Sequence, residues 1–594
     1  VSGPMTWSNA SDIVGAGSVI ANGGLTIGPG TVSLLGRTLV NMASGLLTND
    51  ANGGFFLGSG AILSNAPGAT FDCVGSSTIQ TGAGGGLVAN AGLFRVTGAP
   101  GTTRIEAPFI NHAVVEVQSG TLSLAGGGSC IGASNSIAEI AVSSGALLDF
   151  NGGTFSLDPA AIIDGLGNLS VSGSATADLA GTVVLGGTHT FRGGTANLTG
   201  DYECLSNAVV IAGGTANFNG HGTVAPATLT LGSYGTLGGS NLVTVSGPMI
   251  WGGGGTITGT GGVLANGGLT IGPGDVPLIG RTLVNLASGL WTNDVTHGFA
   301  LGSGAVLSNA PGATFDCVGS STIEGGAGGG LVANGGLFRT LGAPATTTVS
   351  VPFINNGTVE LDAGTLYFQG GDYTQTSGIT YLNGGNLATT SPLQIMGGVM
   401  KGSGLISGAL TNAGLLEPGS PFGEITVGGA YTQTPAGSLD IVLGGPNPLT
   451  GFNRLVVSNS AQLAGALTVT LTNGFAPALG SQFQVLSSHS SSGAFTLLNA
   501  PPGISVNYSN NGVFLVVTGP VSASAVLEAP QLSGGNFRFS FQTESNQSYT
   551  VQQNTDLSTT NWLFVTNFTG DGSLLQFETP AATPPQNFFR VRQP

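Results

Sequence analysis

The feature that most constrains this chain is an internal duplication with a constant offset of 244 residues. The segment that begins at Val1 starts again at Val245, and the offset then holds without insertion. Over Gly58–Ile79 and Gly302–Ile323 the two copies differ at a single position. Repeats that join without a gap are typical of proteins in which each unit packs on its neighbours in sequence.

A shorter rhythm runs inside each copy, because an Asn followed by small residues returns every 20 to 25 positions. These Asn residues are Asn41, Asn65, Asn90, Asn111, Asn285, Asn309, Asn334, Asn355 and Asn412. The interval matches one coil of three short strands joined by tight bends, whereas propeller blades repeat at about 40 to 50 residues. Asn tolerates the backbone of such bends, and stacked Asn side chains can hydrogen-bond between coils.

Between the bends, apolar and polar residues alternate with period two, as in Val114–Val117, and helical periodicity is almost absent. We therefore predict an all-β protein, a long right-handed parallel β-helix followed by a small C-terminal β-sandwich. The expected parts are repeat unit 1 (1–244), a partial unit 2 (245–375), the last coils with a cap (376–519), and an Ig-like sandwich for attachment or assembly (520–594).

Motifs in the third part carry a family resemblance. They lie at Leu410–Gly414, Glu417–Pro421, Tyr431–Thr434, Arg454–Val457 and Leu467–Val469. This run resembles the C-terminal end of autotransporter-passenger-like β-helix repeat proteins of bacteria. The resemblance implies an exported surface protein whose last coils close the solenoid.

The last segment is richer in aromatic and amide residues. It resembles C-terminal sandwich modules on large secreted proteins of environmental bacteria such as Verrucomicrobia and Planctomycetes. That resemblance implies a role in attachment or sorting.

The net charge and the hydropathy of the chain restrict the kinds of partner that it can bind. The net charge is −16 with 11 Lys and Arg, so no basic stripe can neutralise a phosphate backbone, and nucleic acid is excluded as a partner. Polar residues interrupt every apolar run, which predicts no membrane insertion. The low Lys content and abundant Asn, Thr and Gly favour an extracellular or cell-surface location, and the start at Val1 suggests a form without its signal peptide.

The four cysteines lack the spacing of a metal site. Cys73 and Cys317 are equivalent positions of the two copies, so they lie far apart along a solenoid and cannot pair. We expect buried, reduced thiols, with a disulfide between Cys130 and Cys204 as the alternative.

Enzymatic β-helices need clustered carboxylates. Here the nearest candidates are the pairs Asp201/Glu203 and Glu360/Asp362, which we interpret as solvated faces. No catalytic residue, metal or cofactor is expected, and irregular coil lengths argue against a flat Thr lattice that could bind ice. The alternative is a carbohydrate-binding or carbohydrate-active β-helix, for which Trp7 and Trp251 are the aromatic positions to inspect, although packing at a coil corner is their favoured role.

The favoured function is a structural surface rod, adhesive and assembled end to end into a fibre. Strands at the ends of a β-helix expose unpaired backbone groups that template further pairing. The expected assembly residues are Val1 at one end and Phe588, Phe589 and Val591 of the terminal strand at the other. The expected further partner is a surface glycan or another cell-envelope component.

Overall fold

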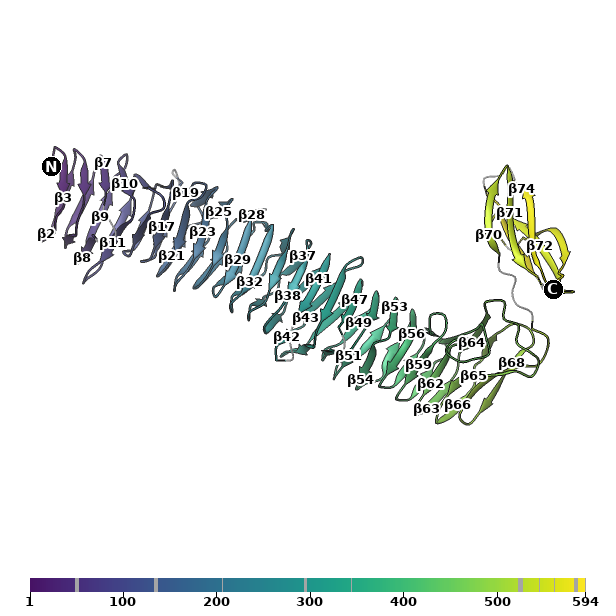
Figure 1. Ribbon diagram of the computed structural model, residues 1–594. Coiled ribbons are helices and arrows are strands. Elements are labelled where there is room, and N and C mark those ends of the chain that lie inside the picture. Colours follow the sequence, from purple (N-terminus) through teal and green to yellow (C-terminus); the bar gives the residue numbers. More distant parts are fainter. Residues whose placement is uncertain are drawn as a thin grey trace. The chain divides into compact units, whose positions relative to one another are not determined.

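The computed structural model describes residues 1–48, 53–132, 137–205, 207–292, 296–342, 345–521, 527–543, 545–559, 561–581 and 586–592. These residues form strands, turns and bends (Figure 1). They belong to two compact units, Val1–Thr374 and Gln375–Pro594. The described part of the chain contains no helix with the length and apolar character to cross a membrane.

In the first unit, each coil consists of three short strands separated by bends. β1 (Met5–Trp7), β2 (Ser11–Val14) and β3 (Ser18–Ala21) make the first coil, and β4 (Leu25–Ile27) then lies parallel to β1. Each later strand pairs in the same way with the third strand after it, so three parallel sheets run along the unit. We call the sheets that contain β1, β2 and β3 face A, face B and face C.

Inward side chains form continuous apolar ladders, because every coil places a buried residue above that of the coil before. On face B this ladder is Phe55, Ile79, Ile105, Leu124, Phe150, Val171, Phe191, Ile211, Leu231, Trp251, Ile271, Trp291 and Cys317. Burial of each large side chain contributes about 1.5–3 kcal/mol. One coil alone could not bury these groups, so stability comes from stacking.

The 244-residue repeat does not contain a whole number of coils. β1 corresponds to β35 (Met249–Trp251), which is the 34th strand after it, whereas 11 complete coils hold 33 strands. Strands of the first copy therefore recur one face further around, from A to B, from B to C and from C to A. For example, β10 (Thr70–Val74) lies on face A, and its duplicate β44 (Thr314–Val318) lies on face B. Eleven coils place the duplicates about 53 Å apart along the axis, at about 4.8 Å per coil.

The second unit begins with parallel coils and then changes its pairing. β65 (Gln482–Ser487) pairs with the parallel strand β62 (Arg454–Val457) on one side and with the antiparallel strand β69 (Gly512–Val517) on the other. β68 (Ile504–Ser509) completes an antiparallel hairpin with β69. The cap of the solenoid is thus a hairpin added to one face.

The chain ends in two small antiparallel sheets. One contains β70 (Glu528–Ser533), β71 (Asn536–Gln542) and β74 (Leu574–Pro580). The other contains β73 (Leu563–Thr569), β72 (Ser548–Asn554) and β75 (Phe588–Arg592). Both contribute to one buried cluster, which consists of Phe539, Phe541, Tyr549, Val551 and Phe577. The predicted fold class is confirmed as a parallel β-solenoid of about 20 coils of about 21 residues with small antiparallel sheets near the C-terminus.

Candidate functional site

The Asn positions singled out from the sequence stack into buried ladders. In the first copy, Nδ2 of Asn41 donates to Oδ1 of Asn65 (2.9 Å), Asn65 donates to Asn90 (2.8 Å), and Asn90 donates to Asn111 (2.8 Å). Nδ2 of Asn111 ends the ladder 3.3 Å from Sγ of Cys130. The second copy repeats the ladder at 2.9, 2.9 and 2.8 Å, through Asn285, Asn309, Asn334 and Asn355.

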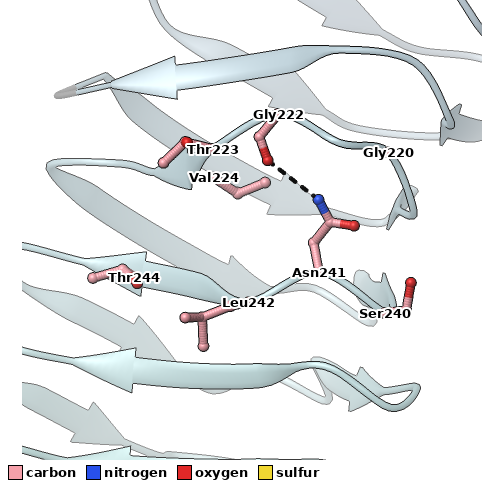
Figure 2. A pocket seen from close by; sticks show the side chains of 8 residues that line it. All are labelled: Gly220, Gly222, Thr223, Val224, Ser240, Asn241, Leu242 and Thr244. Atoms are coloured by element: carbon pink, nitrogen blue, oxygen red, sulfur yellow. Dashed lines mark hydrogen bonds between the residues drawn. The ribbon is translucent and has the colours of Figure 1, made fainter.

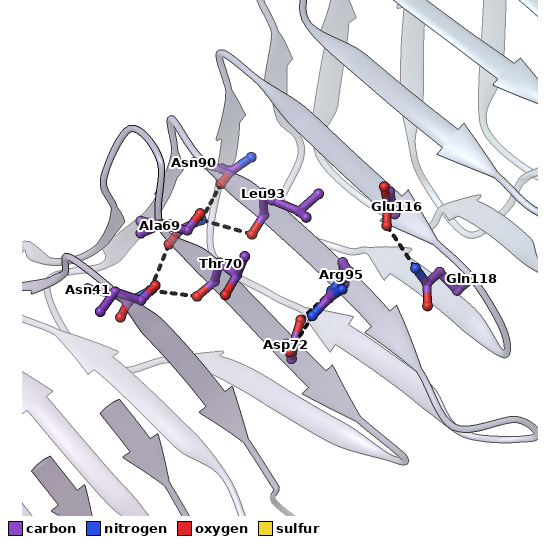
Figure 3. A network of polar contacts seen from close by, with 11 residues as sticks. Asn41, Ala69, Thr70, Asp72, Asn90, Leu93, Arg95, Glu116 and Gln118 are labelled. Carbon is purple, nitrogen blue, oxygen red and sulfur yellow. Dashed lines mark hydrogen bonds and ion pairs between the residues drawn. The ribbon is translucent and has the colours of Figure 1, made fainter. Parts of the chain in front are cut away.

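Each ladder amide also holds the bend beside it. Asn90, shown in Figure 3, donates to the carbonyl oxygens of Gly92 (3.0 Å) and Val114 (3.1 Å) and accepts from the Gly92 amide (3.3 Å). In the second unit, Asn412 donates to the carbonyl oxygen of Ser438 (3.1 Å). These polar atoms are used to satisfy buried backbone groups, so the ladders are structural elements and offer little to an external ligand.

Charged side chains form a second motif, on the outer surface. Arg95 of face A makes a bidentate ion pair with Asp72 of the preceding coil (2.7 and 2.8 Å) and lies opposite Glu116 of the next coil (Figure 3). The hydrogen bonds that Arg95 donates to Asp72 raise the pKa of Arg95 above its ordinary value. The duplicate pair, Arg339 with Asp316 (2.9 Å for both bonds), lies on face B.

The two acidic pairs considered from the sequence, Asp201/Glu203 and Glu360/Asp362, belong to different coils. Asp201 and Glu203 are exposed, and Glu203 lies in β28 (Tyr202–Leu205). Partial burial, and then the charge of Asp362, raise the pKa of Glu360. Within the residues that the structure describes, no three or more His, Cys, Asp or Glu side chains are arranged to hold a metal ion.

A buried polar cluster centred on His189 was not anticipated from the sequence. Nδ1 of His189 hydrogen-bonds to the Tyr202 hydroxyl, and Nε2 lies 3.2 Å from the carbonyl oxygen of Leu185. Burial lowers the pKa of His189 to about 4, so the ring is neutral at pH 7. Asn207 donates to the Gly187 carbonyl oxygen (2.9 Å) beside it. The residues of this cluster share no repeated spacing in the sequence. They come together because bends between the strands place them inside the solenoid.

All four cysteines are buried and free, so the alternative of a Cys130–Cys204 disulfide is wrong. Burial raises the pKa of both thiols to about 11, which keeps them protonated at neutral pH. Trp7 and Trp251 are also buried and pack edge-on against Phe55 and Phe299, with ring centroids 5.5 and 5.3 Å apart. Their role is packing inside the coil.

A hollow of about 440 Å³ opens at the corner between faces C and A (Figure 2). Its lining residues are Gly220, Gly222, Thr223, Val224, Ser240, Asn241, Leu242 and Thr244. It lies beside β31 (Val224–Ala225), which is two residues long and pairs with β34 (Val243–Val245) at a single position. Nδ2 of Asn241 donates to the Gly222 carbonyl oxygen at 3.4 Å.

Face C also carries a row of threonines in register. The row is Thr154, Thr176, Thr195, Thr215, Thr236 and Thr256. The variation in coil length is therefore absorbed by the bends and does not disturb the strands, so irregular coil length is not an argument against an ordered threonine row. Two positions after these threonines, on the same strands, polar side chains also bond from coil to coil. Nδ2 of Asn217 donates to Oδ1 of Asn197 (3.0 Å), and Nδ2 of Asn197 donates to Oδ1 of Asp178 (2.8 Å).

The expected assembly residues are engaged within their own chain. The amino group of Val1 donates to the carbonyl oxygen of Ile20 at 2.8 Å. Phe588, Phe589 and Val591 lie in β75, which pairs with β72, and Phe589 stacks on Phe537 with ring centroids 5.3 Å apart. Lending β75 to another molecule would therefore require its release from β72 and from this stack.

The coils and ladders define the class of the chain, a parallel β-solenoid. No protein-family model and no curated protein sequence matches it. The solved structure of the Hap adhesin from Haemophilus influenzae is similar at 12% identity and a TM-score of 0.24, over 83% of this chain and 64% of the adhesin chain. The match thus spans less than two thirds of the adhesin, and at this TM-score it carries no argument about function.

Proposed function

We propose that this chain is a structural and adhesive solenoid displayed at the cell surface or outside the cell, and that it is not an enzyme. One observation carries the proposal, which is the stacking of coils in register along the first unit. The apolar ladder of face B and the two Asn ladders make a stiff scaffold from short, uniform units. Such a scaffold displays its outer residues at fixed spacing over a long distance.

The distribution of charge supports this proposal. Arg95 and Arg339 are bound to carboxylates of neighbouring coils, and the pair Asp201/Glu203 projects into solvent. Glycosidase chemistry needs two carboxyl groups facing one another across a substrate. The sequence resemblance over 410–469 to autotransporter-passenger-like proteins favours the same surface role.

The proposal is tested by two measurements: adhesion of the chain to polysaccharide or cell-envelope films, and cleavage of the same polysaccharides by the chain. Microspheres coated with the purified chain should be retained on polysaccharide or cell-envelope films, and albumin-coated spheres should not. The same polysaccharides, incubated with the free chain, should release no reducing or unsaturated ends. Turnover that disappears in Asp201→Asn or Glu203→Gln would overturn the proposal, as would equal retention of both kinds of sphere.

We also propose end-to-end self-association. Among the described residues, β67 (Leu497–Asn499) has a strand partner on one side, β64 (Ala466–Leu471). Its side chains are exposed, with Leu497 at 53% and Leu498 at 41% of their full accessible area. An open edge that carries apolar residues favours pairing with a further strand, and Lys is a residue that blocks such pairing. Electron microscopy should show filaments of the full chain that are lost in Leu498→Lys and kept in Leu166→Lys, since Leu166 is an exposed leucine of the first unit that is not part of this edge. Single particles for the unchanged chain would contradict the idea.

A further inference from the structure

We propose that the hollow at the corner of faces C and A binds one sugar residue of a neutral glycan. The inference rests on the proposed adhesive function and names a ligand class for it. Three properties of the hollow support it: the chemistry of the lining, the fixed floor and the size.

The lining presents uncharged hydrogen-bonding groups. The hydroxyls of Thr223 and Thr244 make no hydrogen bond to any residue that the structure describes. Asn241 uses Nδ2 on the Gly222 carbonyl oxygen and has Oδ1 as a further acceptor (Figure 2). Hydroxyl groups both donate and accept, which suits the hydroxyls of a sugar ring.

Apolar contact comes from Leu242, whose side chain borders the hollow and is 53% exposed. An aliphatic surface beside polar groups matches a pyranose, which has C–H groups on its faces and hydroxyls at its rim. None of the lining residues is charged. A carboxylate or sulfate group on the ligand would lose hydration here without gaining a counter-charge, so the site favours neutral sugars.

The floor of the hollow is fixed by close backbone packing. A Cβ atom at Gly220 would lie 1.8 Å from the carbonyl oxygen of Gly200, and one at Gly222 would lie 2.0 Å from that of Tyr202. Only glycine lets these bends approach the preceding coil so closely. The hollow therefore exists before any ligand arrives, and binding does not require a change of conformation.

The volume of about 440 Å³ lies near the lower end of the range for small-molecule sites, which is about 300–1,000 Å³. This volume has room for one sugar ring. Because no aromatic residue lines the hollow, single-site affinity is expected to be low, with a dissociation constant on the order of 1 mM. Adhesion would then depend on many chains acting together.

Saturation-transfer NMR with the full chain tests the inference. The probes are methyl glycosides of gluco, galacto and manno configuration, each compared with its uronic acid. At least one neutral glycoside should bind and the uronic acids should not. In the double variant Thr223→Val/Thr244→Val, which keeps the side-chain shape, affinity should fall by about tenfold, the loss expected for two hydrogen bonds.

Thr215→Val is the matched control, since Thr215 belongs to the row on face C and is not part of the hollow. It should bind within about twofold of the unchanged chain, because its hydroxyl is not one of the two hydrogen bonds removed. Equal binding of uronic acids, undiminished binding by the double variant, or no binding across the whole panel would each overturn the inference. Spheres that still adhere when coated with the double variant would leave the adhesive function standing and reject this site, whereas failure of the unchanged chain to adhere would reject the proposed function itself.

Discussion

Arg37 and Arg281 occupy the same position in the two copies of the repeat, and their surroundings differ. Arg37 is partly exposed and donates from Nε to the Val14 carbonyl oxygen at 2.7 Å. Arg281 is 1% exposed and donates from Nη2 to the carbonyl oxygens of Gly238 and Gly239 (3.2 and 2.5 Å), while its Nε and Nη1 atoms have no hydrogen-bond partner among the residues that the structure describes. Gly238 and Gly239 precede Val245, where the second copy begins, so Arg281 is bonded to residues outside its own copy, whereas Arg37 is bonded within its own copy.

The Asn ladders show the opposite behaviour. The distances between successive amides agree within 0.1 Å in the two copies, because each Asn contacts residues of its own copy. In both copies the first Asn of the ladder, Asn41 or Asn285, has a buried Oδ1 that accepts no hydrogen bond from any described residue, since Ala21 or Ala265 precedes it in the stack. Duplicated sequence thus keeps its structure where its contacts are duplicated too.

Substitutions in the two Asn ladders should give the largest losses of stability, and the losses should be equal in the two copies. Asn90→Ala and Asn334→Ala each leave buried donors and acceptors unpaired, so each should cost about 2–4 kcal/mol of local stability. Hydrogen exchange of β12 (Gly86–Asn90) and β46 (Gly330–Asn334) measures this loss. Asn22→Ala, at an exposed bend, is the control and should have little effect. Losses that differ by more than about 1 kcal/mol between the two copies would show that the ladders are not equivalent.

A second test uses a position at which the copies differ. Trp291 takes the place of Leu47, and its buried indole N–H has no hydrogen-bond partner within the described part of the chain. Trp291→Leu should lose about 2 kcal/mol, less than the 3–5 kcal/mol that is usual when a buried Phe or Trp becomes Ala, because Leu refills part of the space and an orphaned donor is removed with the ring. Hydrogen exchange in β41 (Ser288–Thr292) reports the change. A loss above about 4 kcal/mol would mean that the orphaned N–H costs nothing.

The arginine comparison predicts a gain in stability. Arg281→Met removes a buried and incompletely paired charge, so it should stabilise β40 (Thr282–Asn285) by about 1 kcal/mol, whereas Arg37→Met should be close to neutral. Burial lowers the pKa of Arg281 to about 10. The charge penalty is therefore present in full below pH 10, and the advantage of the Met variant should shrink as the pH rises above that value. Destabilisation by Arg281→Met at pH 7 would refute this account.

The outer ion pairs should give the smallest effects. Arg95→Ala and Arg339→Ala each remove a pair whose side chains remain about one quarter to one third exposed, so each should cost about 0.5 kcal/mol and less at high salt. The two pairs lie on different faces and 11 coils apart, so the double variant should show the sum of the single losses. Denaturation followed at low and high salt measures both. Coupling between the two sites would contradict their independence.

Much of the solenoid could be predicted because its signals are local. The Asn at each bend and the apolar alternation between bends specify one coil, and the equal spacing of Asn41 and Asn65 in both copies specifies how coils stack. The rotation of the second copy could not be predicted in this way. It depends on the exact number of strands in 244 residues, and short strands such as β31 leave no clear pattern in the sequence.

The candidate hollow and the His189 cluster escaped sequence reasoning for a related reason. Thr223 and Thr244 are ordinary residues of two successive coils, and they line one hollow because β31 and β34 stack with Val224 beside Val243. His189 and Tyr202 come from neighbouring faces and meet inside the coil. None of these residues belongs to the Asn rhythm, so the spacing that aligns successive coils does not predict their contacts.

The extra strand in each repeat makes the duplication a screw operation. One step moves a surface pattern along the axis by 11 coils and turns it by about a third of a revolution. Two ligands bound to the duplicated Asp72/Arg95 and Asp316/Arg339 patches would point in different directions and would not collide. A single flat partner could contact only one of them. Duplication by this step places copies of a surface patch on different faces of the solenoid. A repeat of a whole number of coils would instead have placed both copies on the same face.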